Sequence, residues 1–600
     1  MPAGVSLDAA PAVLGVTRSA TGRRWSPSVA DDRLSLALSQ RLSIPEVLGR
    51  VLAARGVDLE TAADHMNPTL RGDLPDPSRF KDMDVAAGRL ARAIMAGEPI
   101  TVFGDYDVDG ATSAALLKRF CVAVGGQLAF YIPDRIKEGY GPNAPALRRI
   151  AADGTRVVVT VDCGTLAHKP LATAAEIGLE VIVVDHHLAE PALPPALAVI
   201  NPNRTDEDRT YGQLAAVGVA FLLVIATNRA LREAGWYAER DEPELLEWLD
   251  LVALGTVCDV VPLTGVNRAF VAKGLAVMAR RRNIGLAALA DVARQNGPPS
   301  TYHLGYILGP RINAGGRVGR ANLGARLLTT TDPDEANEIA RELDRLNAER
   351  RAIEALVQEE AMAQAARRYT EHPGPLVMVV GEGWHPGVIG IVASRLKDHY
   401  GRPALVVAID EKGTGRGSGR SVVGANLGAA VAAAHAAGLL RSGGGHAMAA
   451  GLTVARDQVE NLQRFLVAKL ASQVAGLDIG RPLHIDGSLA PGAVNGDFAA
   501  ALARAGPYGA GNREPRFAIA DARVVGAKIV GIDHVRCTLT GAHGGRVDAI
   551  AFGQADGPIG EALLAPGRAA LHVAGTIRPD RRSARMQLII EDVARAGQGA

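Results

Sequence analysis

The sequence predicts an α/β protein of several domains that ends in a small β-barrel. Three patterns predict it. Apolar runs alternate with helical stretches over 99–265, a shorter α/β pattern spans about 374–455, and five short β runs fill about 512–597. At 600 residues the chain is too long for one ordinary core, so three or four domains are expected.

The first domain is expected to contain a parallel sheet. Its predicted strands, at 100–103, 128–132, 157–161 and 181–184, are continuous Val/Ile-rich runs separated by helical patterns at 111–124, 145–152 and 169–177. Such runs are typical of strands covered on both faces. A second helical block follows from 213 to about 290.

The other boundaries follow composition and periodicity. Residues 1–45, rich in Ala, Ser, Pro and Arg, are expected to be loosely ordered, and short helical patterns follow. A long charged stretch predicts a linking helix, with Asp332 as its N-cap, Pro333 in the first turn and Glu335 completing a capping box. The Gly-rich tail suits an OB-type barrel, with a sandwich as the alternative. The predicted segments are 1–45, 46–98, 99–331, 332–372, 373–456 and 457–600.

Composition describes a globular protein, with 48% hydrophobic and 22% charged residues and a net charge of +1 that excludes no class of partner. No apolar run reaches the roughly 18 residues of a membrane span, and no secretion signal is evident at the N-terminus. The cysteines form no CxxC pair and are expected to be reduced thiols in the cytoplasm; they are Cys121, Cys163, Cys258 and Cys537.

The sequence Gly-Asp-Tyr-Asp-Val-Asp-Gly at 104–110 places three carboxylates, Asp105, Asp107 and Asp109, in a predicted loop after the first strand. A loop or N-cap role would explain one of them. Three that alternate repel one another, and a divalent cation would offset that repulsion.

Further metal-binding residue types follow other apolar runs. Asp162 follows 157–161, Asp185-His186-His187 follows 181–184, and Asp259 lies in the helical block. Alone, Asp162 could form a turn and a histidine could be a core residue. Ligands of open α/β sheets bind beyond the carboxyl ends of the strands, so these groups are expected to meet at one edge.

Carboxylates with one or two imidazoles suit Mg²⁺ or Mn²⁺, and the absence of cysteine ligands disfavours structural zinc. The set is large enough for two ions about 3.5–4 Å apart that share a carboxylate. Such a pair clamps the attacking and leaving oxygens of an in-line displacement at phosphorus. No Ser or Cys nucleophile is then needed.

Asp185-His186-His187, together with 104–110, Asp162 and Asp259, resembles the DHH phosphoesterase superfamily. Within it the chain resembles the RecJ family of bacterial exonucleases, which act on single-stranded DNA from the 5′ end. The further motifs are 308–317 (LGPRINAGGR), 384–390 (WHPGVIG), 417–421 (GSGRS), 443–451 (GGGHAMAAG) and 507–515 (PYGAGNREP). The resemblance covers about 80–595 and implies a parallel-sheet DHH domain, a linking helix, a DHHA1 domain and an OB-type barrel.

The resemblance also implies site residues. The metal ligands would be Asp107, Asp109, Asp162, His186 and Asp259, with Asp162 bridging two ions of Mn²⁺ or Mg²⁺. Asp105 would be an additional ligand or support the ligands, and His187 would serve either the metal or the scissile phosphate.

A second set of residues is expected to bind DNA phosphates. Arg311 and Arg317 offer fork-shaped donors, and the glycines beside Asn313 could form a tight backbone that presents N–H groups to an anion. The glycine-rich stretches at 417–420 and 443–446 repeat this pattern, although ordinary turns would have the same composition. The full predicted set is Arg311, Asn313, Arg317, His385, Ser418, Arg420 and His446.

The tail would extend this DNA track through its arginines, although a solvated basic turn explains them equally well. Its arginines are Arg578, Arg581, Arg582 and Arg585, and its few aromatics include Tyr508, Phe517 and Phe552.

The leading hypothesis is a metal-dependent exonuclease that degrades single-stranded DNA 5′→3′ to 5′-mononucleotides in recombination and repair. The alternatives are a DHH phosphoesterase for short oligonucleotides or cyclic dinucleotides, and a catalytically silent scaffold. The resemblance implies a cytoplasmic monomer with no membrane contact, and a single-strand binding protein and a RecQ-like helicase as partners.

Overall fold

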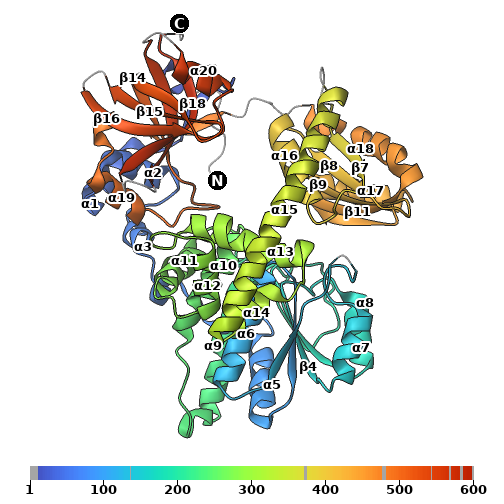
Figure 1. The fold of residues 1–600 in the computed structure, drawn as a ribbon. Coiled ribbons are helices and arrows are strands. Elements are labelled where there is room, and N and C mark those ends of the chain that lie inside the picture. The colour runs from blue at the N-terminus through green and yellow to red at the C-terminus, as the bar shows by residue number, and fades with distance from the viewer. Residues whose placement is uncertain are drawn as a thin grey trace.

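The computed structural model describes residues 11–135, 137–369, 374–475, 482–541, 544–565, 569–580 and 585–597. In Figure 1 a large α/β domain lies below, the barrel and a second α/β domain lie above it, and one long helix rises between them. No helix in these ranges is long and apolar enough to cross a membrane. The predicted multidomain α/β architecture is confirmed.

The first domain is built on an all-parallel sheet with strand order β3-β2-β4-β5-β6. Four of its strands were predicted within one or two residues, and the short β6 was not. Every strand runs the same way, so all the carboxyl ends meet at one edge. The strands are β2 (Ile100–Gly104), β3 (Leu128–Tyr131), β4 (Val157–Val161), β5 (Glu180–Val184) and β6 (Ala198–Ile200).

Helices cover both faces of this sheet, which explains why its strands are apolar without alternation. One face packs with α5, α6 and α9 in a single large core, and the other packs with α7 and α8. The helices are α5 (Met83–Ala96), α6 (Val108–Ala123), α7 (Ala144–Ala152), α8 (His168–Glu176), α9 (Ala216–Glu233), α10 (Leu249–Cys258), α11 (Gly265–Met278), α12 (Ile284–Val292), α13 (Gly309–Val318) and α14 (Leu323–Thr329).

The linking helix α15 (Pro333–Arg368) is continuous over 36 residues. The Asp332 carboxylate caps it by accepting from the Asp334 N–H at 2.9 Å. The predicted capping box is wrong in its second half. Glu335 binds the Thr330 hydroxyl and Arg326, and the Asp332 N–H donates to Thr330 Oγ1 at 3.1 Å.

The second α/β domain contains a five-stranded sheet of order β10-β11-β9-β8-β7. Helix α18 contributes Leu462, Leu466 and Leu470 to the same core as β8, so the packed unit extends beyond the expected end at residue 456. The elements are β7 (Val377–Glu382), α16 (Ile389–Tyr400), β8 (Ala404–Ile409), β9 (Thr414–Arg420), α17 (Leu427–Ala436), β10 (Ser442–His446), β11 (Ala449–Ala455) and α18 (Val459–Val474).

The glycine clusters at 417–420 and 443–446 lie in strands β9 and β10, so the predicted tight turns are wrong at both places. The glycines make room for neighbouring side chains. A Cβ at Gly417 would lie 2.6 Å from Leu452 Cδ1, and one at Gly419 would lie 2.6 Å from Leu427 Cδ2. Real Cβ atoms do not approach so closely.

The tail is a closed barrel, as predicted, because β14 pairs with both β15 and β17. A sandwich is thereby excluded. Its elements are β12 (Leu483–Ile485), β13 (Gly487–Ser488), α19 (Gly496–Arg504), β14 (Arg516–Val530), β15 (His534–Gly541), β16 (Gly544–Ala551), α20 (Pro558–Leu564), β17 (Leu571–Pro579) and β18 (Met586–Arg595).

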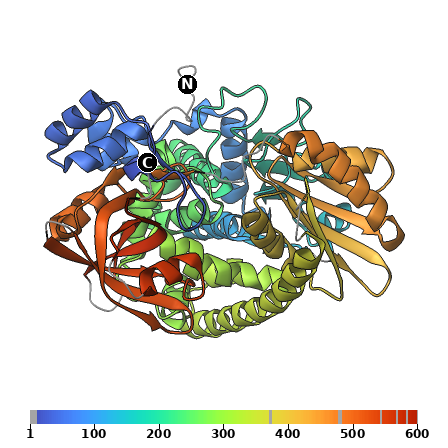
Figure 2. The same ribbon diagram turned by 90° about the horizontal axis from the view of Figure 1, so that it is seen from above.

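The expectation that 1–45 is loosely ordered is wrong for residues 11–45, and residues 1–10 lie outside the described ranges. Strand β1 (Trp25–Pro27) pairs in parallel with β12, and the fully buried Trp25 indole donates to Asp592 Oδ2 at 2.9 Å. Helices α1 (Asp32–Leu42), α2 (Glu46–Ala54) and α3 (Ala62–Met66) share the barrel's core. Figure 2 shows them in blue beside the red barrel.

Candidate metal centre

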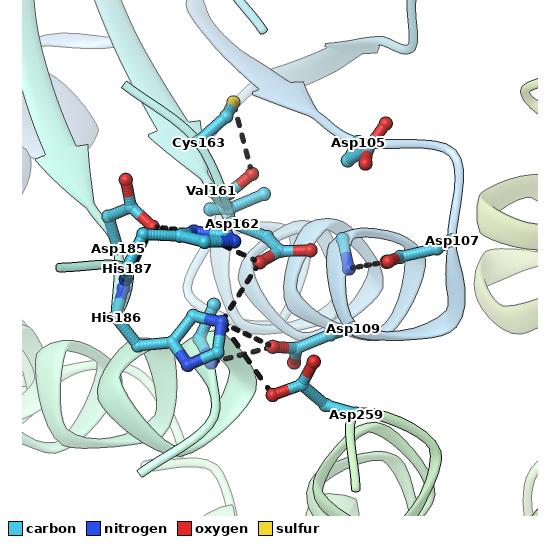
Figure 3. A network of polar contacts seen from close by, with 12 residues as sticks. Asp105, Asp107, Asp109, Val161, Asp162, Cys163, Asp185, His186, His187 and Asp259 are labelled. Atoms are coloured by element: carbon cyan, nitrogen blue, oxygen red, sulfur yellow. Dashed lines mark hydrogen bonds and ion pairs between the residues drawn. The ribbon is translucent and has the colours of Figure 1, made fainter. Parts of the chain in front are cut away.

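The acidic and imidazole residues meet at the carboxyl edge of the first sheet. Asp105 directly follows β2, Asp162 follows β4, and Asp185 follows β5. Asp259 comes from a different element, as the C-cap of α10. Figure 3 shows Asp162, Asp109, Asp259 and His186 directed toward one another, with Asp105 and Asp185 on either side of them.

The aspartate-rich segment is shorter as a loop than predicted. Helix α6 begins at Val108, so Asp109 lies in its first turn and Asp107 is its N-cap, accepting from the Gly110 N–H at 3.1 Å. Gly110 is needed here because a Cβ would lie 2.7 Å from the backbone nitrogen of Asp105. The close turn places all three carboxylates on the sheet edge.

The Asp109 carboxylate is fixed by the start of α9. Its oxygens accept from the N–H groups of Ala216 and Val217 at 2.7 and 2.8 Å. The N-terminus of a helix carries partial positive charge, which favours the ionised carboxylate. Burial and the nearby Asp107 act in the opposite direction and raise the pKa of Asp109.

His186 lies at the centre of the cluster (Figure 3). Its Nε2 is 3.3 Å from Asp162 Oδ1, 3.6 Å from Asp259 Oδ2 and 3.9 Å from Asp109 Oδ2. Burial, followed by repulsion from His187, lowers the pKa of His186 to about 4. A neutral imidazole is the form that binds a metal.

Asp185 holds the two histidines in place. Its Oδ1 accepts from the His186 N–H at 2.8 Å and lies 2.7 Å from His187 Nδ1, while Oδ2 accepts from the Thr165 N–H at 3.0 Å. Burial opposes its charge, but the hydrogen bond from His187 and the two imidazoles lower the pKa of Asp185 overall. Burial lowers the pKa of His187, but the hydrogen bond to Asp185 and the charge of Asp185 outweigh this effect and raise the pKa to about 9.

The cluster is electrostatically incomplete without a cation. Burial, and then the neighbouring carboxylates, raise the pKa values of Asp105, Asp162 and Asp259. His186 Nε2 and Asp259 Oδ2 are buried and find no hydrogen-bond partner among the described residues. Unpaired buried polar atoms of this kind are costly, and a divalent cation between them would satisfy both.

The cluster contains three groups of three residues, and within each group the candidate ligand atoms all lie within 4.8 Å of one another. The described residues therefore fit Mg²⁺ or Mn²⁺, which prefer oxygen ligands. The groups are Asp162-His186-His187, Asp109-His186-Asp259 and Asp105-Asp107-Asp162.

Two residues beside the cluster were missed from the sequence. The Tyr140 hydroxyl donates to the Asp162 carbonyl at 2.9 Å and supports Asp162 in a left-handed conformation with φ 58°. Arg135 lies 3.9 Å from Asp105 Oδ2 and over the rings of Tyr106 and Tyr140. Both follow β3 at the same sheet edge. A search for polar residues beyond the carboxyl end of every strand could therefore have found them.

Part of the predicted phosphate set adjoins the aspartate-rich segment. A Cβ at Gly316 would overlap Tyr106, so the end of α13 packs directly on that segment. The next residue, Arg317, donates to the Gly387 carbonyl of the second α/β domain at 3.0 Å. Arg420 donates to Ser418 Oγ at 3.2 Å. Burial, then repulsion from Arg317 and Arg135, lowers the pKa of Arg420.

The other predicted phosphate contacts are less direct. The segment 309–318 is helix α13, so the tight backbone predicted around Asn313 is wrong. Arg311 is bound to Asp344 at 2.9 Å and to the Ile307 carbonyl. His385 Nδ1 accepts a hydrogen bond from the Gly387 N–H. His446 is the last residue of β10, and strand β11 lies between it and Arg420.

The barrel offers less to DNA than its composition suggested. Arg578 is paired with Glu514, while Arg581 and Arg582 lie outside the described residues. Phe517 is fully buried, and Tyr508 packs beneath Arg55 with its hydroxyl on the Leu502 carbonyl.

Comparison with known proteins accounts for all three domains. The model of the DHH family, N-terminal domain, matches residues 99–256, that of the DHHA1 domain matches 373–473, and that of the RecJ OB domain matches 485–592. A single-stranded-DNA-specific exonuclease RecJ from Dickeya dadantii is 39% identical over 526 residues, covering 85% of this chain and 89% of the relative. The chain belongs to the RecJ family.

Other RecJ relatives agree. The Escherichia coli protein is 36% identical over 85% of this chain and 89% of its own length, and the Bacillus subtilis protein is 32% identical over 96% and 71%. Among solved structures, RecJ of Thermus thermophilus in complex with Mn²⁺ matches with a TM-score of 0.77 and 29% identity, covering 94% of this chain and 78% of that one. Its complex with Mg²⁺ matches with a TM-score of 0.71.

Proposed function

We propose that this RecJ-family chain is a metal-dependent exonuclease that degrades single-stranded DNA 5′→3′ to 5′-mononucleotides. The observation that carries the proposal is the set of three ligand groups at the sheet edge, in which Asp162 and His186 each belong to two groups. Relatives that align over most of the chain are named single-stranded-DNA-specific exonucleases.

In this proposal two divalent cations are held at the sheet edge, by Asp107, Asp109, Asp162, His186 and Asp259. Asp162 would contribute to both ions, since it belongs to two of the three ligand groups. Asp105 adds a ligand or supports the others. Mg²⁺ or Mn²⁺ bound there would activate water and neutralise charge at the scissile phosphate.

The chain's own groups orient the substrate. Asp185 fixes the His187 ring and, against the effect of burial, raises the pKa of His187 to about 9, so in this proposal His187 would donate a hydrogen bond to the scissile phosphate. The Tyr140 hydroxyl holds Asp162 through its backbone carbonyl and leaves the Asp162 carboxylate to face His186. Both carboxylate oxygens of Asp109 accept backbone N–H groups, and this fixes the orientation of that ligand.

The 5′ polarity would come from Arg317 at the end of α13 together with Ser418 and Arg420 of the second α/β domain. Arg317, Ser418 and Arg420 lie beside the aspartate-rich segment, and their donors suit the extra charge of a terminal 5′ phosphate. The other predicted residues would contact phosphates farther along the strand or support these donors; they are Arg311, Asn313, His385 and His446. The strand would then enter with its 5′ end against the arginines.

The barrel favours DNA over the alternative of a short oligonucleotide or cyclic dinucleotide, since a third domain is not needed for a small substrate. The complete ligand set argues against a silent scaffold. A role in recombination and repair, a cytoplasmic monomeric state, and a single-strand binding protein and a RecQ-like helicase as partners belong to the proposal and rest on the family resemblance.

The test compares degradation of 5′-labelled single-stranded DNA with Mn²⁺ by the parent protein, by Asp162→Asn and by Asp250→Asn. Asp250 is a matched control because it is also a buried aspartate of the first domain with a raised pKa. Asp162→Asn should lose at least about 100-fold in rate, since loss of supporting groups alone costs 10- to 100-fold. Equal rates for the parent and Asp162→Asn would refute the proposal.

A further inference from the structure

The segment that precedes α13 carries an exposed aromatic pair that the proposed chemistry does not use. Tyr302 and Tyr306 stack with ring centroids 5.4 Å apart and an interplanar angle of 22°. Tyr306 is 73% exposed, which makes it the most exposed aromatic side chain among the described residues. An exposed stack of this kind contributes little to a core.

The backbone beneath the pair is a π-helix, His303–Leu308. Its apolar residues Leu304 and Leu308 are buried in the core of the first domain, whereas Tyr306 lies on the exposed side. π-Helical turns are rare and occur frequently at functional sites. The fold thus anchors this segment through its leucines and leaves Tyr306 exposed and Tyr302 half-buried.

The segment lies near both the metal centre and the barrel. At one end, the Cys258 thiol contacts the Leu304 carbonyl at 3.4 Å, and the next residue is the metal-ligand candidate Asp259. At the other end, Tyr302 is among the groups that act electrostatically on Arg578 at the end of β17. In Figure 1 the adjoining helix α13 lies on the side of the first domain that faces the other two domains.

We propose that Tyr302 and Tyr306 form a stacking platform for a nucleobase of the single strand as it passes between the metal centre and the barrel. This inference rests on the proposed function. Every base has a π-face, so an aromatic platform binds single strands without reading their sequence. It adds to what the barrel offers, where Phe517 is fully buried, Tyr508 is half-buried beneath Arg55 and Phe552 is exposed.

The test uses the full chain in an Asp162→Asn background, so that bound DNA stays intact. Affinity for a 5′-phosphorylated 20-mer is measured for Tyr306 as it stands, for Tyr306→Ala and for Tyr306→Phe. We expect Tyr306→Ala to bind about 5- to 100-fold more weakly and Tyr306→Phe to bind normally, because Phe keeps the stacking face. Leu36→Ala on α1 is the control, an exposed apolar side chain in the N-terminal helices.

A second measurement moves the change to the DNA. Single abasic sites are placed at each position of the 20-mer. An abasic site at one position should weaken binding about as much as Tyr306→Ala does. The same abasic site should cause no further loss of affinity in the Tyr306→Ala protein.

Unchanged DNA affinity in Tyr306→Ala would refute the stacking platform and would indicate that the two tyrosines bind a protein partner. So would a loss of affinity that Tyr306→Phe shares, or one accompanied by a lowered unfolding midpoint. Failure of the parent protein to degrade single-stranded DNA would instead refute the proposed function, so the two failures are distinguishable.

Discussion

A single methyl group added to a residue that is not a metal ligand is expected to impair the metal centre. Gly316 lies in α13 and packs against Tyr106, which stands between Asp105 and Asp107. In Gly316→Ala the new Cβ would lie 2.6 Å from Tyr106 Cβ, whereas real Cβ contacts are essentially never under 3.0 Å. Tyr106 Cβ is one bond from the backbone, so the clash cannot be relieved by rotating the ring alone.

The magnitude follows from how far the segment must move. Overpacking of this kind costs about 1–3 kcal/mol of stability. A shift of about 1 Å at a catalytic group costs on the order of 100-fold in rate, and metal sites tolerate only about 0.2 Å. We therefore expect Gly316→Ala to need about 10- to 100-fold more Mn²⁺ for half-maximal nuclease activity.

The assay is a Mn²⁺ titration of the cleavage rate of labelled single-stranded DNA, with thermal unfolding measured in parallel. Gly88→Ala is the matched control. It lies within α5, where the nearest atom to a new Cβ is the flexible Arg92 guanidinium at 3.5 Å, and it should be neutral or stabilising. An unchanged Mn²⁺ requirement in Gly316→Ala would refute the reasoning that α13 positions the aspartates.

Three further predictions concern protons, substrate and stability. Burial and mutual repulsion raise the pKa of Asp259, so the metal-free site holds protons at neutral pH. Affinity for Mn²⁺ should therefore increase with pH, and calorimetry in buffers of different ionisation enthalpy should detect release of about one proton or more; zero release contradicts this. Arg420→Gln should weaken binding of 5′-phosphorylated strands about 10- to 100-fold relative to 5′-hydroxyl strands, and an equal loss for both would contradict its assignment to the terminal phosphate. Trp25→Ala should destabilise the barrel by about 3–5 kcal/mol in urea denaturation. Trp25→Phe, which removes the hydrogen bond to Asp592 together with part of the buried indole ring, should cost at least about 1–3 kcal/mol. Unchanged stability in both variants would contradict the conclusion that the N-terminal segment stabilises the barrel.

The metal centre could be predicted because parallel strands end at one edge. Asp105, Asp162 and Asp185 follow three different strands, and their convergence requires no knowledge of strand order. Asp259 and the roles of Asp107 and Asp109 at helix starts depend on exact helix boundaries, which local patterns do not define.

The sequence-based predictions were wrong where a residue is required by its contact with a distant part of the chain. Gly316 resembles a turn residue in sequence, yet it is helical and small because Tyr106 packs on it. Gly417 and Gly419 likewise make room for leucines of other elements. Trp25 pairs its strand with β12, and no local pattern in the Ala/Ser/Pro-rich N-terminus could indicate that partner.

The barrel is assembled from both ends of the chain, and this has a consequence for synthesis on the ribosome. Helices α1 and α2 bury Leu38 and Leu48 against elements that begin after residue 480. At about 5–20 residues per second, those partners are made roughly 20–90 s later. The first domain can complete its core in that interval, while the apolar face of the N-terminal helices waits uncovered. The first helices of the chain therefore lack their native packing partners until the last domain has been synthesised.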